Sequence, residues 1–459
     1  MLKKVLIANR GEIALRIIRA CHEMGIKTCA VYSKADENSL FVKLADESYS
    51  IGEALPAKSY LNVDKILTVA KARNCDGIHP GYGFLSESYY FANLVRKNKI
   101  KFIGPDPETI KNMGNKSLAI KTMRENGVPT VPGSDGNVKN IEEAIKIAEK
   151  ISYPLLLKAS SGGGGKGIRR VDSREELVEK FPLVKMEAKA SFKDDSIYME
   201  KLIENPRHIE VQILCDDFSN ILCLGERNCS IQRENQKMIE ESPSPGISQG
   251  LREKLYDAAR KSAKACAYKN AGTVEFLVDK DENFYFLEMN TRIQVEHPIT
   301  EMVTGVDLVK SQLKIASGLD IKNLKVELKG HAIEARIIAK DPLNNFSVSC
   351  GRVNFFHEPG GVDTRFDSDL FTGSEISPYY DSMVGKLIVK DRTRTLAIKK
   401  LRRALEETFV SGISTNIWYL YTICHDFSFI KGNYDTSFIK NNEENILKIM
   451  RSYYDKFLE

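Results

Sequence analysis

A run of glycines between two strand-like segments constrains the fold of this chain more than any other feature. Residues 160–170 read SSGGGGKGIRR; the segment YPLLLKA precedes the run, and a second strand-like segment, IRRVDS, begins at Ile168. Each glycine loses more backbone entropy on ordering than any other residue, so the run indicates a place where bare backbone is needed. We therefore predict a glycine-rich flap between two strands.

The predicted flap differs from two common phosphate-binding loops. Three of its glycines satisfy the spacing G-x-G-x-x-G, but a dinucleotide-binding turn requires a helix after the loop, and here a strand follows. A Walker A loop is excluded because Gly167 follows Lys166 and Ser160 occupies the first glycine position. A flap between strands suits the covering of nucleotide phosphates by backbone N–H groups, with Lys158 reaching a phosphate from the first strand. The alternative interpretation is a flexible surface hairpin.

Length and composition indicate a multidomain protein with an ordinary surface. The 459 residues exceed what one hydrophobic core supports, so we expect roughly two to four domains. Lys and Arg number 67 against 62 Asp and Glu, an excess too small to indicate nucleic-acid binding. Nine cysteines occur without a C-x-x-C pair, which favours free thiols in a reducing compartment. The apolar run after Met1 is too short for a signal peptide, and no stretch approaches the about 18–20 apolar residues of a membrane helix, so we predict a cytoplasmic protein without membrane contact.

The order of elements predicts an α/β unit followed by α+β units. KKVLIANRGEIALRIIRACHEMGIKTCAVYS is typical of a strand, a helix stopped by Gly25 and a second strand, and the single glycine of ANRGEIA excludes the dinucleotide fingerprint. NKSLAIKTMRENGVP indicates a linker helix that ends at Gly127, and the flap unit shows one helix, IEEAIKIAEKI, among strands. We divide the chain into a doubly wound domain (1–105), linker helices (106–130), a lid domain with the flap (131–203), a C-terminal catalytic domain (204–446) and a tail (447–459).

A predicted β-hairpin places two glutamates opposite each other. In TVEFLVDKDENFYFLEMN, two apolar runs flank the polar stretch KDEN, and a turn centred on Asp281 and Glu282 pairs Glu275 with Glu288. Directly opposed residues have Cβ atoms about 4.5–5.5 Å apart, so the two like charges repel unless a cation lies between them. Oxygen ligands beside a phosphate site favour Mg²⁺ or Mn²⁺.

A row of polar side chains follows this hairpin. If the strand alternation continues beyond Glu288, then Asn290, Arg292, Gln294 and Glu296 share one face, whereas Met289, Ile293 and Val295 point away. Such a row can hold a small anion beside a general base, Glu296. The alternative is a solvent-exposed edge strand with salt bridges.

Six segments together resemble the biotin carboxylase family. They are ANRGEIALRIIRAC, HPGYGFLSES, KASSGGGGKGIRR, ENPRHIEVQIL, EMNTRIQVEHPITEM and PYYDSMVGKLIV, and they extend the resemblance from Lys4 to about Lys440. The resemblance implies an ATP-grasp fold, with an N-terminal doubly wound (Rossmann-like) domain, a mobile glycine-rich lid and a C-terminal α+β domain. It also implies carboxylation of biotin with ATP, bicarbonate and Mg²⁺ or Mn²⁺, through carboxyphosphate, which yields the CO₂ that biotin attacks.

The resemblance implies roles for residues that match the family's motifs. Lys116 and Lys158 would contact ATP phosphates beneath the flap, and His208 and Gln232 would lie near the nucleotide. The implied ATP-binding residues are Lys116, Lys158, Gly162, Gly163, Gly164, Gly165, Lys166, Gly167, Glu200, Lys201, Leu202, His208 and Gln232. The implied metal ligands are Glu275, Glu288 and Asn290, which agrees with the hairpin argument.

The implied catalytic residues are Lys237, Arg292, Glu296 and Arg336. Glu296 would deprotonate bicarbonate, and Arg336, in HAIEAR, would stabilise the biotin enolate. The implied bicarbonate-binding residues are Lys237, Arg292, Gln294, Val295 (through its backbone) and Glu296.

Several positions depart from the family's usual pattern. Asn235 stands where a histidine is common near the ribose, and Asn228 stands for the usual aspartate. Ile338 and Lys340 replace an asparagine and a glutamate, and residues 346–351 lack the usual prolines. No named catalytic residue is lost, so we expect activity to be retained, with an ATP affinity that differs from that of relatives.

The biotin is expected on another polypeptide. The chain has no AMKM biotinylation motif and ends at Glu459 without room for a carrier domain. The resemblance implies a biotin carboxyl carrier protein and carboxyltransferase subunits as partners, in an acetyl-CoA carboxylase or, as the alternative, a two-subunit pyruvate carboxylase. It also implies a homodimer through a surface that includes Arg16 and Arg365. Two other interpretations remain: another ATP-grasp ligase, and a nucleotide-binding protein without turnover.

Overall fold

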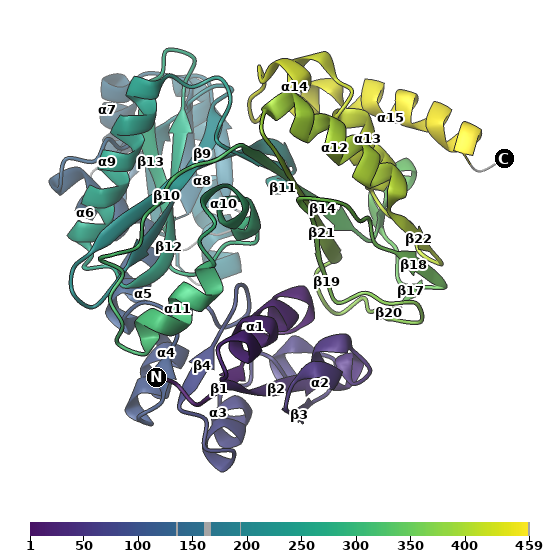
Figure 1. Ribbon diagram of the computed structural model, residues 1–459. Coiled ribbons are helices and arrows are strands. Elements are labelled where there is room, and N and C mark those ends of the chain that lie inside the picture. Colours follow the sequence, from purple (N-terminus) through teal and green to yellow (C-terminus); the bar gives the residue numbers. More distant parts are fainter. Residues whose placement is uncertain (135, 160–166, 193, 458–459) are drawn as a thin grey trace.

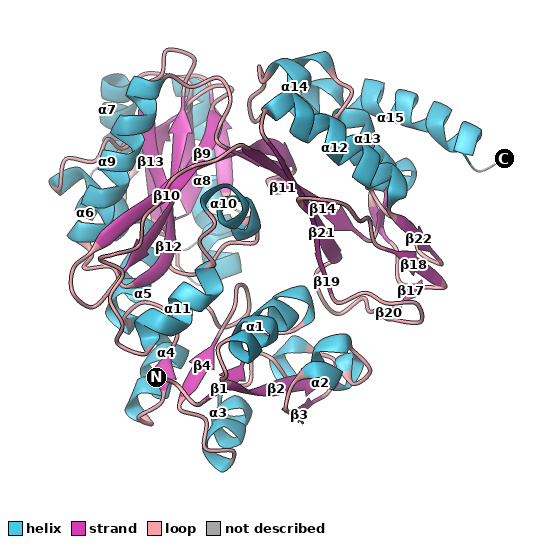
Figure 2. Ribbon diagram, viewed as in Figure 1, coloured by secondary structure: helices cyan, strands magenta, loops and turns pink. Residues whose placement is uncertain are grey.

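A computed structural model describes residues 1–134, 136–159, 167–192 and 194–457 of the chain (Figure 1). It contains a parallel sheet at the N-terminus, a small sheet beside the glycine-rich segment, and a large sheet that extends through the second half of the chain. Figure 2 shows helices beside the strands of the N-terminal sheet and of the large sheet. The predicted combination of α/β and α+β units is therefore confirmed. Residues 160–166 of the predicted flap lie outside the described residues, among them Gly162, Gly163, Gly164, Gly165 and Lys166.

The N-terminal unit is doubly wound, as predicted. Its five strands pair in parallel in the order β3-β2-β1-β4-β5. Val5, Leu6 and Ile7 are fully buried because helices cover both faces of the sheet. Gly25, at φ +69°, follows the first helix, in agreement with its predicted role as a stop. The elements are β1 (Lys4–Ile7), α1 (Gly11–Glu23), β2 (Lys27–Ser33), α2 (Leu40–Leu44), β3 (Glu47–Gly52), α3 (Val63–Ala72), β4 (Gly77–His79), α4 (Tyr89–Lys97) and β5 (Lys101–Phe102).

The flap unit contains two helices, whereas the sequence predicted one. Helices α5 (Pro107–Gly114) and α6 (Lys116–Glu125) lead into it, and its sheet has the antiparallel order β7-β6-β8, with β6 (Leu155–Ala159), β7 (Ile168–Val171) and β8 (Ile197–Lys201). Besides the predicted α7 (Ile141–Ile151), a helix α8 (Arg174–Phe192) packs on the sheet. The prediction was wrong because Pro182, normally a helix breaker, lies inside α8. The two strands predicted to flank the flap are confirmed as β6 and β7.

The large sheet is antiparallel and has eight strands. Their order is β13-β12-β9-β10-β11-β14-β21-β19. Helix α10 packs against β10, β14 and β21, and the N-terminal helix α1 packs against β19 and β21. Its strands are β9 (Arg207–Cys215), β10 (Ile221–Arg233), β11 (Gln236–Ser242), β12 (Asn270–Val278), β13 (Phe284–Asn290), β14 (His331–Ile338), β19 (Thr364–Ser368) and β21 (Met383–Asp391), and its helices include α9 (Gln249–Ala265), α10 (His297–Thr304) and α11 (Leu308–Ala316).

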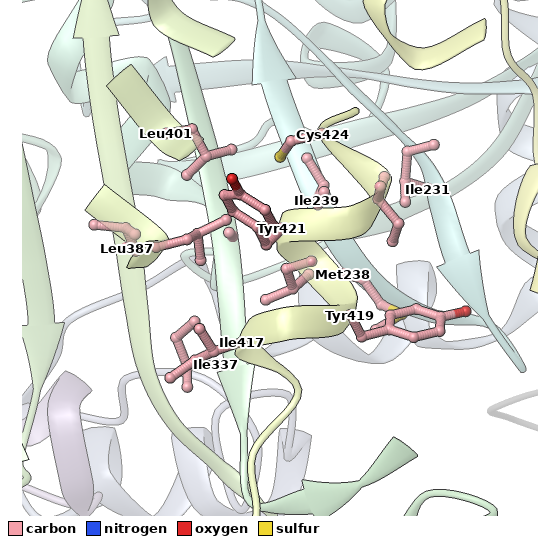
Figure 3. Packing of buried hydrophobic residues seen from close by; sticks show 14 of the residues in the cluster. Ile231, Met238, Ile239, Ile337, Leu387, Leu401, Ile417, Tyr419, Tyr421 and Cys424 are labelled. Carbon is pink, nitrogen blue, oxygen red and sulfur yellow. The ribbon is translucent and has the colours of Figure 1, made fainter. Parts of the chain in front are cut away.

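The C-terminal end of the sheet carries its own hydrophobic core. Figure 3 shows side chains of α13 (Ile417–Ile423), among them Ile417 and Tyr421, between Ile337 and Leu387 of the sheet and Leu401 of α12 (Arg394–Glu407). Helices α14 (Phe427–Lys431) and α15 (Phe438–Phe457) complete this layer, so the boundary predicted at residue 446 falls inside α15. Six short strands pair beside it: β15 (Lys340–Asp341) with β16 (Ser347–Val348), β17 (Gly351–Arg352) with β20 (Glu375–Ile376), and β18 (Phe355–His357) with β22 (Phe409–Ser411).

None of the helices among the described residues has the combination of length and apolar character that crossing a membrane requires. All nine cysteines are unpaired, in agreement with the predicted free thiols.

Candidate active site

The hairpin β12–β13 places Glu275 directly opposite Glu288, as predicted. A register shift between Glu275 and Phe276 displaces the ladder nearer the turn, which the sequence did not indicate. Burial raises the pKa of Glu288, and the charge of Glu275 raises it further. Together with Asn290, the two carboxylates form a set of oxygen donors that fits Mg²⁺ or Mn²⁺, because a cation between them would relieve this repulsion.

Glu275 is the most contacted member of this set. Its Oε1 accepts hydrogen bonds from Nδ2 of Asn290 (2.8 Å), Nε2 of Gln294 (2.9 Å) and Nζ of Lys237 (3.2 Å). Its Oε2 lies 2.7 Å from Nε2 of His208. One carboxylate therefore connects residues that the sequence associated with the metal, the nucleotide and bicarbonate.

Lys237 on β11 is the cationic centre of the site. Its Nζ donates to Glu210 (2.7 Å) and Glu296 (2.7 Å) as well as to Glu275. Burial alone would lower the pKa of Lys237, but the surrounding acidic groups outweigh it and hold the pKa well above its usual value. Lys237 is therefore a permanent positive charge that can receive an anion.

Glu296 lies buried between two cations. Its carboxylate accepts from Lys237 through Oε1 and from the guanidinium of Arg336 through Oε2 (2.9 Å). Burial alone would raise the pKa of the Glu296 carboxyl, but the charges of Lys237 and Arg336 hold it well below its usual range. The group is therefore ionised, which is the state in which it can accept a proton.

The polar row after the hairpin does not continue as a strand, so that prediction was wrong. Strand β13 ends at Asn290, residues 291–296 form a loop, and α10 begins at His297. The side chains nevertheless gather, because Arg292 donates to Asn290 Oδ1 (3.0 Å) and to Gln294 Oε1 (2.5 Å). Ile293 points away into a hydrophobic core, as predicted. Side-chain hydrogen bonds, and not strand pleating, bring the row together.

Most of the described residues associated with the nucleotide lie on two sheets. Lys158 of β6 forms an ion pair with Glu200 of β8, and Gln232 Nε2 lies 2.8 Å from His208 Nδ1. The backbone N–H of Lys201 donates to Pro132 (2.8 Å), so it does not face a ligand. The N–H of Leu202 is likewise taken, by Pro154 (3.0 Å). Lys116 begins α6, and Gly167 precedes β7.

Four residues that depart from the family pattern have defined places in the structure. Asn228 is buried and donates to Ser244 (3.3 Å), and Asn235 occupies the tight turn between β10 and β11 with φ +64°. Lys340 donates to Gln236 (3.5 Å), and the N–H of Ile338 donates to the side chain of Asn416 (2.8 Å).

Several residues of the site were missed by the sequence analysis. Arg227 is fully buried and donates to Glu210 (2.5 Å), which in turn binds Lys237. Glu87 accepts from Arg292 (3.0 Å), and Glu240 accepts from Arg336 (2.5 Å). Strand alternation from His208 could have indicated Glu210, which lies on the same face; the others lie far in sequence from their partners.

Three family models match the chain. "Biotin carboxylase, N-terminal domain" matches residues 1–110, "Carbamoyl-phosphate synthase L chain, ATP binding domain" matches residues 115–324, and "Biotin carboxylase C-terminal domain" matches residues 334–441.

Relatives of several kinds are similar over nearly the whole length. The chain is 52% identical to the biotin carboxylase of Nostoc sp., with 95% of this chain and 98% of the relative covered. It is 47% identical to a pyruvate carboxylase subunit of Methanothermobacter thermautotrophicus, with 98% and 92% covered. Among solved structures, the biotin carboxylase domain dimer of Hydrogenobacter thermophilus 2-oxoglutarate carboxylase, in complex with MgADP, ADP and bicarbonate, is 46% identical with a TM-score of 0.93, and 97% of this chain and 99% of that chain are covered.

Proposed function

Because the chain belongs to the biotin carboxylase family, we propose that it uses ATP and bicarbonate to carboxylate biotin borne on a separate carrier protein. The family membership makes the chain an ATP-dependent ligase of the ATP-grasp fold. The observation that carries the proposal is the buried, ionised Glu296 held between Lys237 and Arg336.

Bicarbonate binds beside Glu296 in this proposal. Lys237, Arg292, Gln294 and the backbone of Val295 hold the anion, and Glu296 takes the proton of its hydroxyl group. The deprotonated oxygen attacks the γ-phosphorus of ATP, the bond to ADP breaks, and carboxyphosphate forms. The Glu296 carboxylate is ionised at neutral pH because nearby cations lower its pKa, and a base must be in that state before it can take the proton.

Biotin then receives the carboxyl group. Carboxyphosphate divides into CO₂ and phosphate, the released phosphate takes the proton from N1 of biotin, and N1 attacks the CO₂. The guanidinium of Arg336 stabilises the negative charge that develops on the ureido oxygen of biotin. Its position supports this role, because Arg336 already holds Glu296 and so lies beside the bicarbonate site.

The nucleotide and metal residues keep the roles that their motifs imply. Lys116 and Lys158 contact the phosphates, the flap glycines cover them, and Glu200, Lys201, Leu202, His208 and Gln232 surround the base and sugar. Because the amides of Lys201 and Leu202 are occupied, we assign their contacts to other atoms of these residues. Glu275, Glu288 and Asn290 hold Mg²⁺ or Mn²⁺, which supplies charge neutralisation at the transferring phosphate.

We assign the chain to a multisubunit acetyl-CoA carboxylase, with a carrier protein and carboxyltransferase subunits as partners, in the cytoplasm. The related pyruvate carboxylase chain makes a two-subunit pyruvate carboxylase the second candidate, with the same chemistry in this chain. A homodimer is proposed because the related domain from Hydrogenobacter thermophilus is described as a dimer.

The decisive experiment measures ADP release by the purified chain with Mg²⁺, ATP and bicarbonate, with and without free biotin and with a biotinylated carrier. We expect release that requires bicarbonate and rises with biotin. A Glu296→Ala variant should still bind ATP but lose about 10²- to 10⁴-fold of this turnover. Stimulation by an amine and not by biotin or the carrier would indicate another ligase, and wild-type turnover equal to that of Glu296→Ala would indicate a nucleotide-binding protein without catalysis.

A further inference from the structure

A fully buried lysine on β21 has no part in the reaction described above. Lys386 lies in the segment PYYDSMVGKLIV, and its side chain is 0% exposed. Lysine is almost never fully buried unless it is paired, because an ammonium group removed from water needs compensating partners. Its contacts therefore show what the lysine stabilises.

Lys386 joins three segments that are distant in sequence. Its Nζ donates to the backbone carbonyl oxygen of Val295 (3.0 Å) and to Oε1 of Glu12 on α1 (2.9 Å). The carboxylate of Glu12 also accepts from the hydroxyl of Tyr82, in the loop after β4. One ammonium group thus ties the N-terminal unit and β21 to the loop that precedes α10.

The carbonyl group that Lys386 holds belongs to the peptide bond between Val295 and Glu296. Strand β13 ends at Asn290, so no sheet pairing fixes this peptide. Glu296 occupies the N-cap position of α10 and makes no side-chain cap bond there, since its carboxylate points to Lys237 and Arg336. The hydrogen bond from Lys386 is therefore a direct restraint on the backbone at Glu296.

Strand register places the two restraints on Glu296 side by side. Lys386 on β21 is the direct partner of Arg336 on β14. Arg336 holds the carboxylate of Glu296, and Lys386 holds the carbonyl group of the preceding residue. Neighbouring strands lie about 4.7–4.9 Å apart. The two paired strands therefore hold the carbonyl group before Glu296 and the carboxylate of Glu296 at the same time.

We propose that Lys386 is a positioning residue that fixes the Val295–Glu296 peptide, so that the Val295 backbone and the Glu296 carboxylate meet bicarbonate in the right geometry. This inference rests on the proposed function and names the residue that connects its bicarbonate site to the N-terminal unit. Lys386 contacts no substrate and acts through the peptide that it holds.

The charges around Lys386 suit a fixed donor and not a titrating group. Burial would lower the pKa of Lys386, but Glu12, Glu334 and Asp367 outweigh it and raise the pKa above its usual value. Asp367 is the direct partner of Lys386 on β19. His297 of α10 lies close to Lys386, and its pKa is held well below its usual value by burial and by nearby cations including Lys386, so that the ring stays neutral.

The test compares bicarbonate and ATP kinetics in Lys386→Met, which keeps the length of the side chain and removes the donor. We expect kcat/KM for bicarbonate to fall about 10- to 100-fold while KM for ATP changes less than about twofold, because a small misplacement at the reacting groups costs much more than remote binding. Bicarbonate-dependent ADP release by the wild type is measured first; its absence would refute the proposed function and not this inference alone.

Lys400→Met is the matched control. Lys400 of α12 also bridges a carboxylate, Asp391 (3.0 Å), and backbone carbonyl groups, those of Lys390 (2.6 Å) and Val362 (3.1 Å), but it contacts the end of β21 and neither Val295 nor Glu296. We expect this variant to lose stability without a selective change in the kinetics of bicarbonate.

A second comparison covers the case in which Lys386→Met fails to fold because it leaves Glu12 unpaired. Glu12→Gln keeps the bond from Lys386 to Val295, and the double variant with Lys386→Met removes both charges of the pair together, which buried pairs tolerate better than the loss of one partner. Compared with Glu12→Gln, the double variant should show the same selective fall in kcat/KM for bicarbonate. Unchanged bicarbonate kinetics in the folded variants would overturn the inference, as would an equal loss for ATP and bicarbonate that tracks thermal stability as in Lys400→Met.

Discussion

Two neighbouring glutamates on β11 should respond in opposite ways to the same substitution. Glu241 accepts from Arg394 (2.6 and 2.9 Å), His331 (2.5 Å) and the hydroxyl of Tyr434. Burial alone would raise the pKa of Glu241, but the hydrogen bonds and charges of His331 and Arg394 lower it to about 2.

Glu240 points to the other face of the sheet and lacks such compensation. It accepts one bond from Arg336 (2.5 Å), its Oε2 has no hydrogen-bond partner among the described residues, and Glu334 is its direct cross-strand partner. Burial, which outweighs the charge of Arg336, raises the pKa of Glu240 to about 7.

The two shifts have similar size and opposite sign. One pKa unit corresponds to about 1.4 kcal/mol, so a shift from the usual 4.5 to about 2 contributes about 3 kcal/mol at Glu241. This contribution is fully present above pH 4.5 and is lost as the pH falls through about 2. The pKa of Glu240 is raised in the folded protein, so its protonated form contributes about 3 kcal/mol of stability below pH 4.5. This contribution is lost as the pH rises through about 7.

The perturbation is Glu→Gln at each position, measured at pH 8. Glu241→Gln should lower the free energy of unfolding by about 3 kcal/mol or more, because the half-buried Arg394 and the buried His331 lose their anionic partner. Glu240→Gln keeps an oxygen acceptor for Arg336 and removes a buried carboxylate, so stability should be unchanged or higher by up to about 3 kcal/mol.

The assay is urea unfolding followed by the fluorescence of Trp418, the only tryptophan of the chain. Trp418 packs against the hydrophobic core of the C-terminal end of the sheet, so its signal reports the layer that contains Glu241. The difference between wild type and Glu240→Gln should shrink between pH 8 and pH 5, where Glu240 takes up its proton. Equal losses in both variants at pH 8 would refute the assignment of opposite charge states.

Three further substitutions test particular features of the fold. Glu234→Asn should raise the free energy of unfolding by about 0.5–1 kcal/mol, measured by urea unfolding, because Glu234 (φ +51°) and Asn235 (φ +64°) form a two-residue turn that favours asparagine; no gain would argue against that turn. Pro182→Ala should stabilise the flap unit by about 1–3 kcal/mol, so amide hydrogen exchange in α8 should be slower in the variant than in the wild type. Slower exchange in the wild type would contradict a continuous helix at Pro182. Arg227→Met should cost about 3–5 kcal/mol, measured by urea unfolding, since it leaves Glu210 buried without its guanidinium; a loss below about 1 kcal/mol would contradict that pairing.

The sequence predicted those parts of the fold that depend on residues close together in the chain, such as the hairpin and the strands beside the glycine run. The pairing of Glu275 with Glu288 follows from the strand period of two and the position of the turn, and the structure confirms it. The strands on either side of the glycine run were predicted for the same reason. Helix α8 was missed because Pro182 dominates the local pattern, whereas its buried residues Leu177, Phe181 and Val184 follow helical spacing and are fixed by packing on the sheet.

The loop from Thr291 to Glu296 shows why the rest could not be predicted. The sequence predicted that the polar side chains of this segment lie together, and it predicted a strand. Alternating polar and apolar residues are typical of a strand, but a loop whose side chains are bound by distant residues can show the same alternation. What determines the loop is a set of bonds from residues far away in sequence. Lys237, Arg336 and Lys386 each come from a strand of the large sheet, and each reaches Val295 or Glu296.

The cations that hold Glu296 lie on strands and the carboxylate of Glu296 lies on a loop, and this arrangement has a physical reason. Two of the cations that hold Glu296, Lys237 and Arg336, lie on strands whose backbone pairing fixes them, whereas Glu296 lies on a loop whose backbone has no such pairing. An ionised carboxylate that is 0% exposed is stable only if its cationic partners stay in position, and backbone pairing of the strands holds these partners in position. The same bonds that stabilise the buried charge therefore also determine where the loop runs. The same hydrogen bonds position Glu296 and stabilise its charge. The geometry of the site therefore depends on pairs of residues that are distant in sequence and not on any single segment.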